Sequence, residues 1–247
     1  MDLYAFPPIA AILNAAYSFL MWLATLLEPL AGASAAAASV VLLTIIVRSA
    51  LIPVGIAQAK AEQTRSRLAP QLRALQQRHK GDPERLQRET MRLYANENAS
   101  PLAGCLPLLI QAPVVGVVYA LFLHPIIGGT ANTLLGEQLF GVTLGTSLVG
   151  AVAGGTVTLA TVAVFGVLLV AIAVVAEVTR RAFRPPVLAV DAAGLTGIAT
   201  TRLVGALQFS TAVFAMFVPL AATLYLTVTV AWTLVQRVIL RRRHPLL

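Results

Sequence analysis

The sequence is poor in charge, in cysteine and in the motifs of catalysis. Charged residues make up only 11% of the 247 positions, against roughly 25% in a soluble domain. One cysteine excludes an internal disulfide, and the three histidines are scattered without metal-ligand spacing. No HExxH, GxSxG or Walker sequence occurs. These absences argue against a soluble domain, a metal centre, a protease and an ATPase, and we expect neither a cofactor nor enzyme activity.

Long apolar runs fill much of the chain. Hydrophobic residues account for 58% of the positions, and the mean hydropathy is +0.82. Several runs approach or exceed the 17–25 residues that a helix needs to cross a bilayer. The composition therefore predicts an all-α, multi-pass integral membrane protein whose environment is the lipid bilayer.

The Lys and Arg residues are distributed with a strong bias. Nine of the eighteen lie in residues 58–100, four in 180–202 and four in 237–243, and Arg48 is the remaining one. Residues 1–47 and 93–179 contain none. The positive-inside rule places the three basic regions, and with them the C-terminus, in the cytoplasm. The formal charge of +8 is thus a topology signal, and we expect no direct binding of nucleic acid.

Alternation across the membrane predicts a bundle of five transmembrane helices. The expected spans are Ser34–Ala57, Leu102–Ile126, about Val157–Thr179, and two helices within Leu203–Ile239 that meet at an outer turn around Pro219. The expected organisation is an outer interfacial helix (1–32), a membrane core (33–57 and 101–240), a cytoplasmic helical hairpin (58–100) and a short basic tail (241–247).

Two segments allow more than one interpretation. Ile9–Leu30 is apolar enough to span, but Tyr17 and Trp22 and the lack of a basic flank favour a helix in the outer interface, with the N-terminus outside. Gly128–Thr158 is expected to be an outer loop that could dip into the membrane. A cleaved signal peptide is not expected, because no positive region precedes the first apolar run.

Arg48 is the most informative single residue. A guanidinium stays charged wherever the fold places it, and an arginine near the centre of a membrane helix costs about 3 to 10 kcal/mol or more. Arg48 is either a helix-end arginine that reaches the headgroups or a residue that faces a wet cavity. Thr44 lies one turn earlier on the same face.

Other polar side chains recur within the predicted spans. Taken singly, each is more typical of a hydrogen bond between neighbouring helices than of a path for a substrate. Together with Arg48 they could form a continuous hydrophilic surface. These candidates are Thr44, Gln111, Gln208, Tyr225, Thr229 and Trp232.

The charged segment Gln58–Asn98 has the pattern of two amphipathic helices separated by Lys80–Pro83. In this break Gly81 can end one helix, Asp82 can cap the next, and Pro83 suits its first turn. Nine basic and five acidic residues leave the segment at +4. A solvated loop near anionic lipid and an arm that captures or docks partners fit equally well. The basic candidates for such an arm are Arg65, Arg73, Arg78, Lys80 and Arg85.

Three stretches resemble the YidC/Oxa family of membrane protein insertases. Thr44–Pro53, with the sequence TIIVRSALIP, is similar to that family's first core span. Asn98–Pro113, NASPLAGCLPLLIQAP, is the most specific match, and Leu224–Gln236 is similar to the last span. The lipobox-like letters around Cys105 fall inside this match and are interpreted as a coincidence.

The resemblance implies a bacterial inner-membrane insertase of the short type, which works without nucleotide hydrolysis. It implies a hydrophilic groove, open to cytoplasm and lipid, in which Arg48 matches the family's buried arginine. Nascent membrane proteins would be the clients, and whether the ribosome and a Sec translocon are partners stays open. The chain departs from the family in its single methionine, Met216, within the fourth span and in its short tail after Arg243, and it shows no large outer domain.

Two other functions compete with this one. A small transporter or channel could use Arg48 as an anion site, although no repeat relates the two halves of the chain. A purely structural membrane subunit would leave the cost of Arg48 unexplained.

Overall fold

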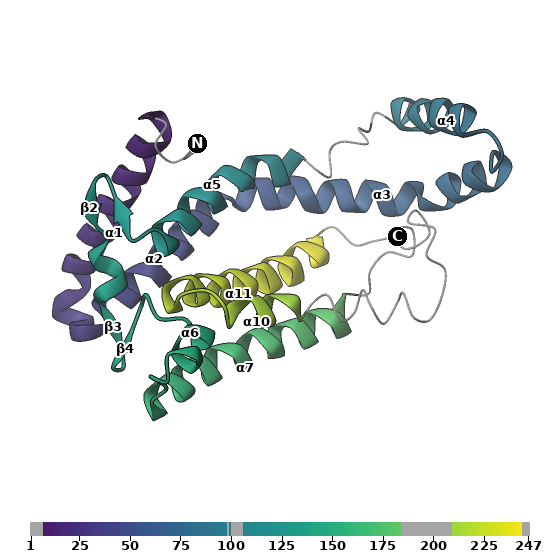
Figure 1. Ribbon diagram of the computed structural model, residues 1–247. Coiled ribbons are helices and arrows are strands. Elements are labelled where there is room, and N and C mark those ends of the chain that lie inside the picture. The colour runs from purple at the N-terminus through teal and green to yellow at the C-terminus, as the bar shows by residue number, and fades with distance from the viewer. Residues whose placement is uncertain (1–6, 98, 100–105, 184–208, 244–247) are drawn as a thin grey trace. The chain divides into compact units, whose positions relative to one another are not determined.

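A computed structural model describes residues 7–97, 99, 106–183 and 209–243, and the chain in it is mostly helical (Figure 1). The chain divides into two compact units. The first unit comprises Met1–Ala50, Pro113–Ala182 and Gly205–Leu234. The second comprises Leu51–Ala112, Phe183–Val204 and Val235–Leu247.

The first unit begins with two helices that pack against each other. Helix α1 (Pro7–Ala31) leads through a short 3-10 turn, η2 (Gly32–Ser34), into α2 (Ala35–Ala50). Gly32 has a φ of +51°, which a residue without a Cβ adopts at little cost, and this lets the chain reverse. The structure confirms a helix where Ile9–Leu30 predicted one. Its place in the membrane interface stays a prediction.

The first predicted span is divided. Helix α2 ends at Ala50, and α3 (Ile52–Arg78) begins after Leu51 and runs without a break past residue 57. The boundary therefore differs from the expected end of the span at Ala57. Pro53 supplies the reason, because proline donates no backbone hydrogen bond and suits the first turn of a new helix.

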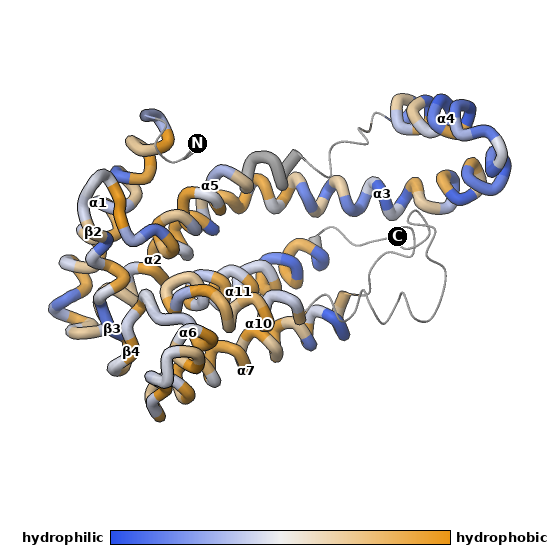
Figure 2. Tube along the Cα trace, viewed as in Figure 1, coloured by the Kyte–Doolittle hydropathy of each residue, from blue (hydrophilic) through white to orange (hydrophobic). Residues whose placement is uncertain are grey.

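Within the described part of the chain, three helical stretches are long and apolar enough to cross a membrane: Pro7–Ala50, which contains α1 and α2, Leu159–Ala182 and Leu220–Arg242. The last two correspond to α7 (Leu159–Ala182) and α11 (Leu220–Arg243). Each is hydrophobic over most of its length and becomes hydrophilic at its C-terminal end (Figure 2). The chain is thus a multi-span helical membrane protein, and the count of five spans stays a prediction.

The other predicted spans are represented in part. Helix α5 (Leu106–Leu123) covers most of the second span, and α10 (Ser210–Ala215) covers the end of the fourth. Residues 203–208 lie outside the described part of the chain. The chain leaves helical structure after α10 and begins α11 directly after Pro219, as the sequence predicted for a turn at that proline.

The expected outer loop is a folded cap rather than an irregular connection. This cap, residues 126–153, contains two short antiparallel ladders, β1 (Ile126–Ile127) with β2 (Thr130–Ala131) and β3 (Gln138–Leu139) with β4 (Val142–Thr143). It also contains the 3-10 turn η4 (Thr133–Gly136) and helix α6 (Leu148–Ala153).

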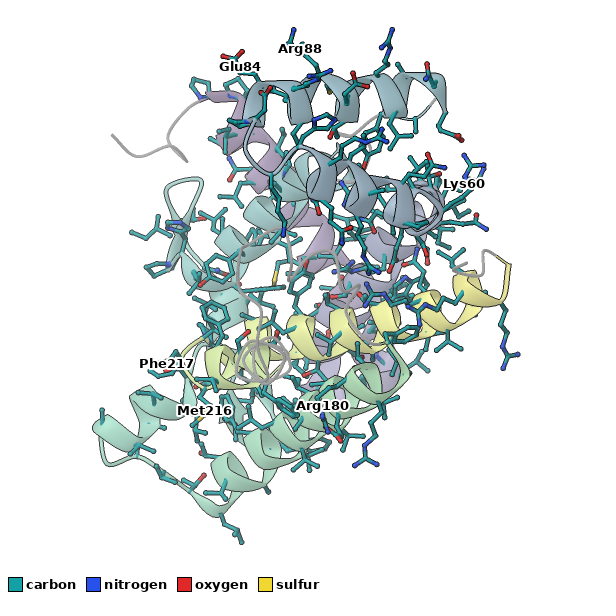
Figure 3. All side chains as sticks on the ribbon, turned by 90° about the vertical axis from the view of Figure 1, so that its right-hand side faces the viewer. Lys60, Glu84, Arg88, Arg180, Met216 and Phe217 are labelled. Carbon is teal, nitrogen blue, oxygen red and sulfur yellow. The ribbon has the colours of Figure 1, made fainter. Side chains whose placement is uncertain are left out.

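Backbone hydrogen bonds attach the cap to the turn between α10 and α11, which Met216 and Phe217 mark in Figure 3. The Val149 amide donates to the Met216 carbonyl at 3.0 Å, and the Leu220 amide donates to the Thr146 carbonyl at 2.9 Å. The cap is therefore part of the first unit's framework.

The core of the first unit joins α1, α2, α5, α7, α11 and the cap. Its fully buried side chains include Leu20, Val40, Phe122, Phe165 and Leu220. Apolar burial of this kind contributes about 25 cal/mol per Å² removed from water. The core holds the two helices that carry the candidate site, α2 and α11.

The second unit contains the charged hairpin. Helix α4 (Pro83–Asn96) begins at the predicted break, where the Asp82 carboxylate accepts a hydrogen bond of 2.9 Å from the Arg85 amide. Leu68 and Tyr94 are buried where α3 and α4 pack together. Glu84 and Arg88 point away from α3 (Figure 3). The two helices on either side of the break and the cap at Asp82 agree with the sequence prediction, and the cytoplasmic hairpin as such stays a prediction.

Candidate functional site

Arg48 lies in the last turn of α2 and is half-buried. It forms no hydrogen bond or ion pair with any residue in the described part of the chain. Its neighbours Ile45 and Ile46 are 39% and 41% exposed, and Leu43 is buried in the core. The protein thus holds a charge beside apolar side chains without a partner among the described residues.

Glu177, the carboxylate on the membrane helix α7, does not neutralise Arg48. It pairs within its own helix, with Arg180 at 2.7 Å and Arg181 at 2.5 Å. This excludes a dry ion pair between Arg48 and Glu177, which would have argued against a hydrated site.

Thr44 has a structural role on the same helix. Its side chain is 2% exposed, and its hydroxyl donates to the Val40 carbonyl at 2.7 Å. Ser39 does the same toward the Ala36 carbonyl at 2.7 Å. The hydroxyl of Thr44 is therefore satisfied by its own helix, although the residue shares a face with Arg48.

The predicted residues of α11 fall into two kinds. Tyr225 is 6% exposed, and its ring packs in the core against Phe122, with the ring centres 6.2 Å apart. The Thr229 hydroxyl and the Trp232 indole nitrogen are buried, and neither has a hydrogen-bond partner among the described residues. Buried polar groups are nearly always bonded in folded proteins, so these two are exceptions among the described residues.

Gln236, on the same helix, also carries a buried polar group, but it was not among the predicted site residues. Its amide nitrogen is buried without a partner in the described part of the chain. A Cβ added at Gly55 would lie 1.7 Å from this nitrogen, so the amide sits directly against α3. The signal was present in the sequence, because Gln236 follows Thr229 and Trp232 at helical spacing, seven and four residues later.

Two predicted residues cannot be placed at the site. Gln208 lies outside the described residues. Gln111 belongs to helix α5, but the description does not extend to its side chain. Their part in a common polar surface stays a prediction.

The predicted basic residues of the hairpin, in the second unit, are all exposed. They are Arg65, Arg73, Arg78, Lys80 and Arg85. The described cross-helix ion pair of the hairpin is formed instead by Arg67 and Glu97, at 2.7 Å. The five predicted residues therefore present positive charge on the hairpin surface, which suits an anionic lipid surface or an acidic partner.

Comparison with known proteins identifies the family. A family model described as 60Kd inner membrane protein matches residues 27–246. The chain belongs to this family. The match includes α2, α11 and the hairpin, and it confirms the resemblance to the YidC/Oxa group.

Several similar proteins carry the name membrane protein insertase YidC. One from Clostridium perfringens is 40% identical over 84 residues, which cover 34% of this chain and 35% of that protein. One from Helicobacter pylori is 43% identical over 81 residues, or 33% of this chain and 15% of that protein. One from Aquifex aeolicus is 41% identical over 81 residues, or 33% and 16%. The matched stretch thus spans about a third or less of these relatives.

Proposed function

We propose that this protein is a membrane insertase, which moves transmembrane segments of client proteins from the cytoplasm into the bilayer. Family membership and the insertase name of the relatives support this activity. The observation within the chain that carries it is Arg48, a half-buried cation with no partner among the described residues.

Arg48 would line a hydrophilic groove that is open to the cytoplasm and to lipid. The half-buried Arg48 side chain and the buried, unpaired groups of Thr229 and Trp232 support a wet interior. Gln111 and Gln208 are proposed to add to the same surface. Water in such a groove lowers the cost of moving a short polar segment, because the segment keeps part of its hydration.

The driving force would come from the client. About 20 apolar residues reach lipid as the client helix leaves the groove, and their transfer is favourable without nucleotide hydrolysis. Acidic groups on the client's leading tail would be attracted to the charge of Arg48. The clients of this mechanism are nascent membrane proteins, delivered with or without a ribosome or translocon.

The proposed topology places the cap outside and the hairpin in the cytoplasm, because every strongly basic region falls on one side. Single cysteines at positions 137, 78, 184 and 243, in a Cys105→Ser background, test this with a membrane-impermeant thiol reagent. Position 137 should react from outside, and the other three only after the membrane is opened. External labelling at position 78 would overturn the scheme.

The hairpin would capture clients at the cytoplasmic mouth. Its described apolar burial is small, with Leu68 and Tyr94 as its buried side chains, so the membrane helices should not depend on it for folding. Shortening α3 and α4 by one turn each around residues 80–83 should reduce insertion and leave the helical bundle intact. If the shortened protein is no longer stably produced, the hairpin is a structural brace and the capture role is wrong.

Reconstitution tests the function as a whole. The purified chain is placed in protein-free liposomes, and a short single-span client is added without nucleotide. Insertion above the level of empty liposomes supports the proposal. Insertion equal to that of empty liposomes contradicts it, and anion flux in the same vesicles without insertion would favour a transporter.

A further inference from the structure

The β3–β4 hairpin of the cap ends in an unusual turn. Leu139 pairs with Val142, so Phe140 and Gly141 form a two-residue loop between the strands. Both have positive φ, 49° at Phe140 and 82° at Gly141. This is the pattern of a type I′ turn, which favours Asn or Gly at its first central position.

Phe140 is a poor residue for that position in water. A left-handed backbone conformation is uncommon for a bulky side chain, and Phe140 is the non-glycine residue with positive φ in the described chain. Its side chain is 76% exposed, so no packing within the protein compensates. An asparagine would form the turn more readily and would tolerate water. An apolar environment around the tip would explain the phenylalanine.

The chain segment that contains the β3–β4 hairpin is apolar as well. Residues 125–158 contain one charged side chain, that of Glu137. Other apolar side chains of this region are also exposed, including Ile126 at 64% and Val152 at 62%. A connection of this length in water would be expected to carry more charge.

The contacts of the β3–β4 hairpin place it next to an apolar helix. Strand β3 contacts η2 and α2, and β4 contacts the membrane helix α7. Helix α7 begins at Leu159, whose side chain is 87% exposed. The β3–β4 hairpin therefore lies beside a helix that is long and apolar enough to cross a membrane (Figure 1).

We propose that Phe140 inserts into the lipid interface and anchors the cap to the bilayer surface. The lipid is that of the outer leaflet, a point that rests on the topology proposed above. Aromatic side chains are favoured at the level of the headgroups. The anchor would hold the cap against the membrane while helices α10 and α11, to which the cap is hydrogen-bonded, accommodate a client.

The test measures where position 140 lies when the full chain is in vesicles. Phe140→Cys in the Cys105→Ser background is labelled with an environment-sensitive NBD dye. The protein is reconstituted into phosphatidylcholine–phosphatidylglycerol vesicles with or without doxyl-labelled lipid. The control is Glu137→Cys with the same dye, because Glu137 is exposed and lies just before the same hairpin.

The proposal predicts emission at shorter wavelength at position 140 than at 137, and a several-fold greater loss of fluorescence in doxyl vesicles. Two results would overturn it. Equal quenching of both positions by aqueous iodide would place the tip in water. A short-wavelength emission at 140 that doxyl lipid leaves unchanged would place the tip against protein, such as a second copy of the chain. No client is present, so the result is independent of insertase activity.

Discussion

Helix α7 and the part of α11 up to Leu234 belong to the first unit, but polar groups on them differ in whether they have a hydrogen-bond partner. On α7 the charges are satisfied locally, since Glu177 binds both Arg180 and Arg181, and the Thr179 hydroxyl donates to the Val175 carbonyl. On α11 the polar atoms of Thr229 and Trp232 are buried and have no partner among the described residues. Local pairing removes the need for water. In the proposed mechanism, the polar groups that lack it, at Thr229 and Trp232 on α11 and at Arg48 on α2, line the surface that accommodates a polar client segment.

The largest effect is expected on α11 itself, where a paired threonine, Thr223, and an unpaired one, Thr229, lie six residues apart. Thr223 is fully buried, and its hydroxyl donates to the Ala215 carbonyl at 3.0 Å. Thr223→Val removes this bond and leaves a buried carbonyl without it, which should cost about 1–3 kcal/mol of stability. Thermal unfolding in detergent measures the loss.

Thr229→Val is the matched variant. Its hydroxyl has no partner in the described chain, so stability should stay the same or rise, while insertion should fall because the groove loses a polar group. A loss of stability as large as that of Thr223→Val would show that Thr229 is structural.

A smaller effect is expected at Trp232, the other residue of α11 whose polar group is proposed to serve insertion and not stability. Trp232→Phe removes the indole N–H but keeps an aromatic ring, so the change in stability should be below about 1.5 kcal/mol. Insertion should fall moderately. Trp22→Phe is the control, because Trp22 is 55% exposed on α1 and stacks on Phe19 at 5.7 Å. Equal effects of the two variants on insertion would remove Trp232 from the groove.

The smallest effect is expected at the paired charges of α7. Glu177→Gln breaks the ion pairs with Arg180 and Arg181, whose side chains are 46% and 76% exposed. Exposed pairs contribute little to stability, so melting temperature and insertion should both stay close to those of the unmodified protein. Impaired insertion here would mean that the two kinds of helix do not differ in function.

Much of this arrangement could be predicted from the sequence. Hydropathy and the distribution of arginines predicted the apolar helices, and Gly81, Asp82 and Pro83 predicted the start of α4 because their backbone preferences act locally. The division at Leu51 was missed. Apolar residues continue through it, and hydropathy does not register the effect of Pro53 on the backbone.

The cap was missed for a different reason. The cap depends on hydrogen bonds between segments about 70 residues apart, such as Val149 with Met216, and no local pattern encodes them. Helical spacing put Thr44, Tyr225 and Thr229 on candidate faces, but it could not distinguish the bonded hydroxyl of Thr44 from the unpaired one of Thr229. That distinction depends on tertiary packing.

The charge of Arg48 provides the most direct measurement. Insertion into liposomes is compared for two single-span clients, one with an acidic leading tail and one with a neutral tail, using Arg48→Ala, Arg48→Lys and the control Arg180→Ala. A groove that needs positive charge predicts a large loss for Arg48→Ala with the acidic client, a smaller loss with the neutral one, and largely retained activity for Arg48→Lys and Arg180→Ala. Equal losses in Arg48→Ala and Arg48→Lys with both clients would contradict it, because they would assign Arg48 a specific structural bond.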